Sequence, residues 1–229
     1  MADAVRSRVV IEEVLVAPDA APALVASLRS QGIAVHTVVA DVLAKAVDAA
    51  SPQGVAAIAV RPEVPVETAV ASAANGAISL VLLDIADPGN AGTLLRTAEA
   101  AGAAAVLFCG ASVDPCNPKC VRASAGALFH LPVASGGDAV AVLESLERAG
   151  VRRAATVVRD GIPYDTVDLT GPVAIVLGNE AHGLPDALGA LVDDRLSIPM
   201  AGRSESLNVA MAGAVLCFES LRQRRAAAP

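Results

Sequence analysis

Residues 198–210, with the sequence IPMAGRSESLNVA, decide how the last third of this chain folds. A short apolar strand is predicted to end here, and a polar loop containing Gly202 leads directly into a long apolar helix predicted at 208–222. The first N–H groups of a helix have no acceptor within the helix, so a loop that enters a helix start can hold a ligand with its backbone. This stretch therefore predicts a ligand site where a strand ends.

Two upstream segments have the same form. Residues 87–92, with the sequence DPGNAG, lead into a helix that carries Arg96. Residues 173–177 are a continuous apolar run, typical of a buried strand, and the sequence GNEAHG follows at 178–183. Each segment combines a strand, a turn rich in Gly and Asn, and a helix start. We therefore expect three loops of one kind in the same domain.

Strands and helices alternate around these loops. The predicted strands are 79–85, 104–109, 154–158, 173–177 and 196–199. The predicted helices lie near 91–101, 118–125, 137–149, 185–191 and 208–222. Such alternation predicts an α/β fold with a mostly parallel sheet that is covered on both faces, and ligands bind at the carboxyl ends of the strands in such sheets.

The first third of the chain predicts a smaller α/β domain. Its strands are predicted at 8–16, 33–39 and 55–60, and its helices at 21–30 and 41–49. Residues 61–76 contain two prolines and an Asn-Gly pair, which is typical of a connection between domains. We therefore expect three parts, which are a small domain at 1–70, a linker at 71–78 and a larger domain at 79–229.

Length and composition indicate a globular chain. The 229 residues are 54% hydrophobic, which is enough for a sizeable core. No apolar run approaches the roughly 20 residues that span a bilayer, and the N-terminus has no basic and apolar leader. We therefore expect a cytoplasmic protein that does not contact membranes. The net charge of −7 and the aromatic content of 2% argue against sequence-independent coating of nucleic acid and against base-stacking platforms.

Cysteine spacing and motif searches exclude several classes of protein. Cys116 and Cys120 are spaced C-x3-C, but the histidines are scattered singly, so neither a disulfide framework nor a zinc site is expected. Cys109 and Cys217 lie in apolar segments and are expected to pack in the core. No G-x-G-x-x-G, P-loop, G-x-S-x-G or H-E-x-x-H motif occurs, which argues against dehydrogenases, nucleotide hydrolases, esterases and zinc proteases.

Taken together, the three loops resemble the SpoU branch of the SPOUT superfamily. The residues that carry the match are Asn90 with Arg96-Thr97-Ala98, Gly178-Asn179-Glu180 with Gly183, and Ile198-Pro199-Met200 with Ser206-Leu207-Asn208. The match extends through 114–126, and more weakly through 51–55, so it covers nearly all of residues 80–222.

This resemblance implies a methyltransferase that uses S-adenosylmethionine to methylate the ribose 2′-hydroxyl of structured RNA, with rRNA favoured over tRNA. It also implies a trefoil knot in the C-terminal domain and a homodimer formed through that domain. The small N-terminal domain is expected to resemble a ribosomal protein (L30e-like) and to bind the RNA substrate. Relatives usually begin with a basic segment, whereas only Arg6 and Arg8 are basic here, so this domain is expected to be trimmed.

The resemblance also implies roles for single residues. Those expected to be catalytic are Arg96, Asn90, Glu180, Ser206 and Asn208. Those expected to bind the cofactor are Leu177, Gly178, Gly183, Ile198, Met200 and Leu207. His182 is expected to be a loop residue without a catalytic role, and no metal is implied.

Without the family, the same residues also have simpler structural explanations. Arg96 suits a surface salt bridge, Glu180 suits a capping acid at a helix start, and the two asparagines and Ser206 suit helix N-caps. Two other functions remain open, namely a non-catalytic RNA-binding or assembly protein on the same fold and a different cofactor enzyme on an open α/β sheet. The first predicts the loss of Arg96, Glu180 or Asn208, and all three are present.

Overall fold

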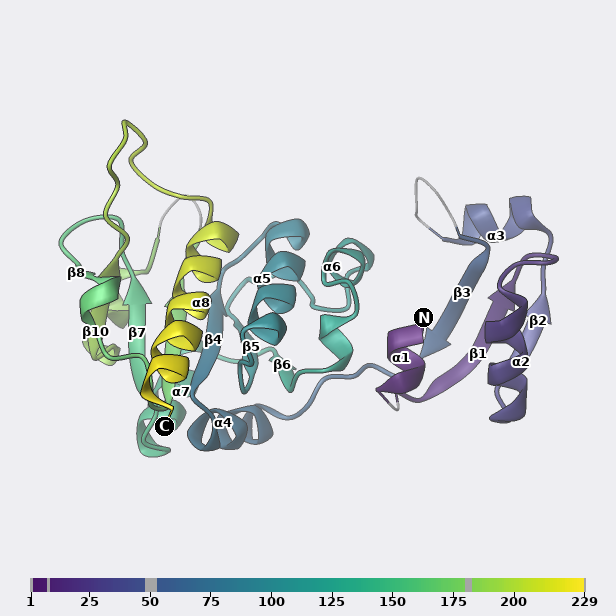
Figure 1. Ribbon diagram of the computed structural model, residues 1–229, viewed down its shortest axis with the longest axis horizontal. Coiled ribbons are helices and arrows are strands. Elements are labelled where there is room, and N and C mark those ends of the chain that lie inside the picture. The colour runs from purple at the N-terminus through teal and green to yellow at the C-terminus, as the bar shows by residue number, and fades with distance from the viewer. Residues whose placement is uncertain (1, 8, 48–52, 180–182, 229) are drawn as a thin grey trace. The chain divides into compact units, whose positions relative to one another are not determined.

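The computed structural model describes residues 2–7, 9–47, 53–179 and 183–228, and the chain divides into two units at 1–62 and 63–229 (Figure 1). This division falls earlier than the predicted linker at 71–78. Residues 71–75 instead belong to helix α4 (Val66–Asn75), which packs into the core of the second unit through small and apolar side chains. Pro65 stands at the N-cap position of this helix. The prolines therefore mark the start of a helix and not a linker that runs through residue 76.

The first unit is a small α/β domain. Its elements are α1 (Ala2–Arg6), β1 (Ile11–Val16), α2 (Pro22–Ser30), β2 (Ala34–Thr37), α3 (Ala40–Ala46) and β3 (Val55–Ala59). The three strands form one sheet in the order β2-β1-β3, in which β1 runs parallel to β2 and antiparallel to β3. The predicted alternation of strands and helices is therefore confirmed. The last residues of the helix predicted at 41–49 lie outside the described residues.

The second unit contains α4 and a seven-stranded sheet with helices on both faces (Figure 1). Its strands are β4 (Ile78–Leu83), β5 (Val106–Cys109), β6 (Val133–Ser135), β7 (Arg152–Thr156), β8 (Ile162–Pro163), β9 (Val173–Leu177) and β10 (Asp194–Ser197). Its other helices are α5 (Pro88–Ala100), α6 (Pro118–Ala123), α7 (Ala139–Arg148) and α8 (Val209–Ala227). Short 3₁₀ helices are η1 (Ala127–Phe129), η2 (Tyr164–Thr166) and η3 (Asp186–Leu191).

The strand order is β6-β5-β4-β9-β7-β10-β8, and each neighbouring pair is parallel. The central strands β4 and β9 are buried along their whole length, as parallel strands covered on both faces should be. Side chains alternate between two cores: Leu80 and Leu82 pack with residues of α5 and α8, and Val81 and Leu83 pack with residues of α4 and α7. The predicted α/β fold with a mostly parallel sheet is confirmed.

Several short elements depart from the sequence pattern. β6 and β8 have three and two residues, which is too short to show a period, and the helix predicted at 185–191 is the 3₁₀ helix η3. The strands predicted at 154–158 and 196–199 begin two residues earlier, at Arg152 and Asp194. Charged residues can start these strands because Arg152 pairs with Asp194, with 3.1 Å between Nε and Oδ2. Within the described ranges, no helix combines the length and the apolar character needed to cross a membrane.

Candidate functional site

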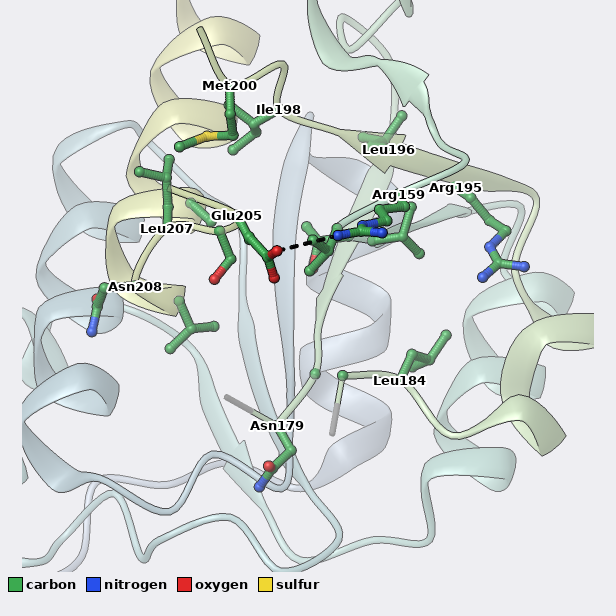
Figure 2. Close-up of a pocket in the computed structure, with 18 of the residues that line it drawn as sticks. Arg159, Asn179, Leu184, Arg195, Leu196, Ile198, Met200, Glu205, Leu207 and Asn208 are labelled. Atoms are coloured by element: carbon green, nitrogen blue, oxygen red, sulfur yellow. Dashed lines mark hydrogen bonds and ion pairs between the residues drawn. The ribbon is translucent and has the colours of Figure 1, made fainter. Parts of the chain in front are cut away.

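A cavity of about 670 Å³ opens in the second unit where the neighbouring strands β9, β7 and β10 end (Figure 2). One wall comes from residues 156–159 at the end of β7, and a second comes from described residues between 178 and 189 after β9. The third comes from the end of β10 and the start of α8. Parallel strands bring their carboxyl ends to one edge of the sheet, so segments far apart in the sequence meet around this cavity.

Gly178 and Gly183, which are both predicted to bind the cofactor, line the cavity. In the loop after β9, the Gly183 N–H donates to the carbonyl of Asn179 at 2.8 Å, which holds these two residues together. A Cβ on Gly178 would lie 2.6 Å from the carbonyl carbon of Gly183. Glycine is therefore required here by the close approach of the chain's own backbone. Glu180 and His182, which lie in this loop, are outside the described residues.

The loop after β10 supplies an apolar side to the cavity. Ile198, Met200 and Leu207 line it, and Met200 and Leu207 leave 36% and 38% of their surface exposed. Figure 2 draws these three side chains as a group on one side of the cavity. Ser206, predicted to be catalytic, also lines the cavity.

Leu177 is also predicted to bind the cofactor, but it is not among the residues that line the cavity. Its side chain is fully buried in the core that α5 and α8 share with the sheet. A Cβ on Gly213 of α8 would lie 3.1 Å from Leu177 Cδ1. The side chain of Leu177 therefore packs the last helix against β9 and does not contact the cavity.

Asn90 and Asn208, separated by 118 residues in the sequence, are joined by a hydrogen bond. The Asn208 side-chain amide donates to Asn90 Oδ1 at 3.1 Å, and Asn208 Oδ1 accepts from the N–H groups of Ala210 at 2.9 Å and Met211 at 3.4 Å. Asn208 is therefore the N-cap of α8 and at the same time the contact to α5. The structure brings these two predicted catalytic residues together at the helix starts.

The N-cap of α5 is Asp87 and not Asn90, which corrects the capping role open to Asn90. Asp87 Oδ1 accepts from the Asn90 N–H at 2.8 Å, and Pro88 occupies the first helical position. The Asn90 N–H and the ammonium of Lys119, 3.3 Å from Asp87 Oδ2, lower the pKa of Asp87. Because Asp87 caps the helix, the Asn90 side chain serves the contact with Asn208 instead.

Arg96 lies apart from the other predicted catalytic residues. It is exposed in the second half of α5 and is not among the residues that line the cavity. Within the described residues it forms no ion pair, so the salt-bridge explanation finds no partner there. The structure thus groups Asn90, Ser206 and Asn208 near the predicted cofactor residues and leaves Arg96 on the outer surface of its helix.

Three charged residues at the cavity were not predicted from the sequence. Arg159 and Glu205 face each other across it, with 3.4 Å between Nη2 and Oε1, and Arg195 of β10 also lines it (Figure 2). The Arg159 and Glu205 side chains are 75% and 80% exposed, so their ion pair contributes little to stability. Arg159 could have been predicted from the sequence, because it follows the predicted strand 154–158 and ligands bind at the carboxyl ends of parallel strands.

A buried arginine fixes the start of β10 beside β7. Arg153 donates three hydrogen bonds to the Asp193 carboxylate, at 2.7 Å from its backbone N–H, 2.9 Å from Nε and 2.8 Å from Nη2. The side-chain bonds to Arg153 lower the pKa of Asp193. This clamp holds the strand from which the third wall of the cavity emerges.

Cys109 and Cys217 are buried in the core, as predicted, and Cys120 is buried as well. Burial raises the pKa of Cys109, Cys120 and Cys217 to about 12, so these thiols stay protonated and unreactive at neutral pH. No group of three or more His, Cys, Asp or Glu side chains that could hold a metal ion occurs among the residues that the structure describes.

Comparison with known proteins identifies both units. Residues 77–218 match the SpoU rRNA Methylase family, and residues 2–65 match the family described as RNA 2′-O ribose methyltransferase substrate binding. The 23S rRNA (guanosine(2553)-2′-O)-methyltransferase RlmP of Bacillus subtilis (strain 168) is 32% identical over 217 residues, which are 94% of this chain and 83% of that protein.

Solved structures agree over nearly the whole chain. The SpoU methyltransferase AviRb from Streptomyces viridochromogenes superposes with a TM-score of 0.87 at 27% identity, covering 98% of this chain and 86% of that one. The S-adenosylmethionine-bound rRNA methyltransferase from Sinorhizobium meliloti superposes with a TM-score of 0.84 at 29% identity, covering 100% of this chain and 85% of that one. The chain therefore belongs to the SpoU rRNA methylase family.

Proposed function

We propose that this protein is an S-adenosylmethionine-dependent methyltransferase that methylates a ribose 2′-hydroxyl of structured RNA, with rRNA as the substrate class. The observation that carries this proposal is the contact between Asn90 and Asn208 beside a cavity lined by Gly178, Ile198 and Leu207. The relatives support it, because RlmP is named for 2′-O-methylation of 23S rRNA and the Sinorhizobium meliloti enzyme binds S-adenosylmethionine in its crystal.

The residues of the cavity fit this cofactor. Ile198, Met200 and Leu207 offer apolar surface for an adenine ring, and the loops at 178–179 and 206–208 offer backbone groups for hydrogen bonds. Ligand sites of this kind combine an apolar wall with a few polar groups that fix orientation. When bound, S-adenosylmethionine supplies an electrophilic methyl group on its sulfonium.

The chain's own polar residues would then orient the acceptor. A ribose hydroxyl is a poor nucleophile, so its oxygen must be held in line with the methyl group and its proton must pass to a group within hydrogen-bond reach. Asn90, Ser206 and Asn208 carry amide and hydroxyl groups that can bind the ribose but are not bases at neutral pH. We assign positioning to these three residues, and contact with the ribose or its phosphate to Arg96.

The exposed position of Arg96 supports a homodimer formed through the C-terminal unit. α8 leaves Met211 and Phe218 about half exposed, at 50% and 49%, although the same helix buries Leu216 and Cys217 completely. Exposed apolar side chains two helical turns apart share one face and favour burial against a partner. In such a dimer, Arg96 of one protomer would complete the site of the other.

We also propose that the C-terminal unit is knotted. Strand β10 lies between β7 and β8, which are consecutive in the sequence, so the chain returns between two strands that are joined by residues 157–161. After β10 it crosses back to α8, which packs on α5. This order supports a trefoil knot, in which the loops that form the cavity pass through one another.

The N-terminal unit is proposed to be a ribosomal-protein-like (L30e-like) module that binds the RNA substrate. Its match to the substrate-binding family and its strand order β2-β1-β3 support this role. The described residues that line the cavity all belong to the second unit, so we assign cofactor binding to that unit and RNA recognition to the first.

The substitution Arg96→Ala tests the proposed chemistry. Because Arg96 is exposed and has no ion pair within the described residues, the variant should keep its melting temperature and its affinity for S-adenosylmethionine. Methyl transfer to rRNA should fall by orders of magnitude, since an interaction made only in the transition state affects turnover. Arg96→Lys should restore little, because an ammonium cannot reproduce the planar guanidinium fork. The measurements are a thermal melt, calorimetric titration and tritiated-methyl transfer on one preparation.

The matched control is Arg148→Ala, which removes an exposed arginine from α7 on the opposite face of the sheet. It should leave transfer unchanged. Retained activity in Arg96→Ala would overturn the catalytic role. A wild-type protein that binds rRNA and S-adenosylmethionine but transfers no methyl group to any rRNA would favour the non-catalytic alternative.

A further inference from the structure

Arg195 stands out among the charged residues that line the cavity. It is exposed, and the structure gives it no ion-pair partner within the described residues. The carboxylates next to it in the sequence are already engaged, since Asp193 binds Arg153 and Asp194 binds Arg152. The other lining arginine, Arg159, is paired with Glu205. A full positive charge is thus presented at the cavity by Arg195.

The position of Arg195 relative to the other lining residues is informative. Figure 2 draws Arg195 and Asn208 on opposite sides of the cavity, with Ile198, Met200 and Leu207 grouped on the side of Asn208. Strand geometry explains this placement, because Leu196 points into the core and its neighbour Arg195 therefore points to the other face of β10.

The chemistry of the cofactor suggests which part reaches Arg195. The sulfonium joins three groups, which are the methyl, the adenosine and an amino-acid chain that ends in a carboxylate. If the proposed function is correct, the methyl group is directed toward Asn90 and Asn208, and the adenine lies against the apolar side chains near them. The amino-acid chain is then left to extend across the cavity toward the opposite side.

We propose that Arg195 recognises the carboxylate of the amino-acid part of S-adenosylmethionine, and so selects ligands that carry this group. Guanidinium and carboxylate form charge-assisted hydrogen bonds with a matching planar geometry. The proposal rests on the proposed function, because it requires that S-adenosylmethionine occupies this cavity. It adds a residue that holds the amino-acid end, whereas the positions at 178, 198 and 207 hold the adenosine end.

The test compares ligands that differ in the amino-acid part, by calorimetric titration of the full chain. S-adenosylhomocysteine and 5′-methylthioadenosine are both uncharged at sulfur, but only the first carries the amino-acid chain. In Arg195→Gln, the affinity for S-adenosylhomocysteine should fall about tenfold or more, the usual effect of losing a charged hydrogen bond. The affinity for 5′-methylthioadenosine should stay within about twofold. Arg195→Lys should retain only part of the preference, because an ammonium keeps the positive charge but cannot form the paired planar hydrogen bonds.

A second ligand pair assigns the effect to the carboxylate. S-adenosylmethionine should lose affinity for Arg195→Gln, and decarboxylated S-adenosylmethionine, which keeps the amine, should not. The matched control is Arg159→Gln, which removes a lining guanidinium that already has a partner. An equal change for both thioether ligands in Arg195→Gln, no change for either, or the same selective loss in Arg159→Gln would overturn the assignment.

The outcomes also separate this inference from the proposed function. A wild-type protein that binds neither S-adenosylmethionine nor S-adenosylhomocysteine would overturn both. A wild-type protein that binds both, together with an Arg195→Gln variant of unchanged ligand preference, would overturn only the role of Arg195.

Discussion

At the scale of the residue, Gly178 shows how the cavity depends on a missing side chain. It follows the fully buried strand β9, and the returning loop at Gly183 and Leu184 passes beside it. A Cβ would lie 2.6 Å from the Gly183 carbonyl carbon and 2.8 Å from the Leu184 nitrogen. These are backbone atoms, so relief requires the loop itself to move and not the rotation of a side chain.

We therefore expect Gly178→Ala to displace the loop that forms one wall of the cavity. Overpacking of this kind costs about 1–3 kcal/mol, so the free energy of unfolding should fall by that amount. The affinity for S-adenosylmethionine should fall with it. Urea unfolding and calorimetric titration measure both quantities. Gly189→Ala is the matched control, because Gly189 also lines the cavity but a Cβ there would meet nothing within 4 Å. Equal behaviour of the two variants would contradict this explanation.

Most of the described residues that the motifs single out lie close together in the structure. Asn90, Ser206, Asn208 and most of the predicted cofactor residues lie at or beside one cavity, although nothing in their spacing places Asn90 next to Asn208. The resemblance implies that Leu177 binds the cofactor, but its side chain packs in the core. Arg159 and Glu205 belong to no motif, and their meeting depends on how two distant loops fold.

At the scale of the element, α8 begins at a residue with two separable functions. Asn208 Oδ1 caps the helix, and its amide nitrogen binds Asn90. An N-cap asparagine or aspartate is worth about 1 kcal/mol relative to alanine, because one side-chain oxygen satisfies N–H groups that the helix leaves without an acceptor.

Substitution at Asn208 should separate these functions. Asn208→Ala should lower the free energy of unfolding by about 1 kcal/mol and also reduce methyl transfer. Asn208→Asp should retain the cap and most of the stability, because a carboxylate oxygen accepts the same N–H groups, but it loses the amide donor and should transfer methyl poorly. Urea unfolding and a methyl-transfer assay decide between them. Full activity in the aspartate variant would show that the amide donor is dispensable.

Long and buried elements were predicted more accurately than short ones. β4 and β9 are continuous apolar runs and were found, whereas β6 and β8 are too short to carry a pattern. The sequence predicts part of α4 as linker, because Pro62 and Pro65 precede the helix, Asn75 ends it and Gly76 follows. Those residues mark the two ends of the helix.

At the scale of the whole molecule, the order of the strands in the sheet could not be predicted from the sequence pattern. Alternating strands and helices indicate a parallel sheet, but they do not place β10 between β7 and β8. That placement brings the loop after β10 beside the loop after β9 and so forms the cavity. It depends on contacts between distant segments, among them the Arg153–Asp193 clamp. Only the family resemblance supplied an expectation at this level.

The last prediction concerns assembly through α8. Met211 and Phe218 lie two turns apart on this helix and are about half exposed, so burial against a second copy would remove their apolar surface from water. We expect the wild-type protein to be a dimer at micromolar concentration by light scattering.

Phe218→Asp should give a monomer, because a charge buried without a partner at such a contact is strongly unfavourable. The monomer should stay folded, since residue 218 is exposed in the single chain, but methyl transfer should be lost if Arg96 acts across the interface. Val140→Asp on α7, where Val140 is 37% exposed on the opposite face of the sheet, should leave both the dimer and the activity intact. A monomeric wild type, or a monomeric Phe218→Asp variant with full activity, would contradict a shared site and return Arg96 to the chemistry of its own protomer.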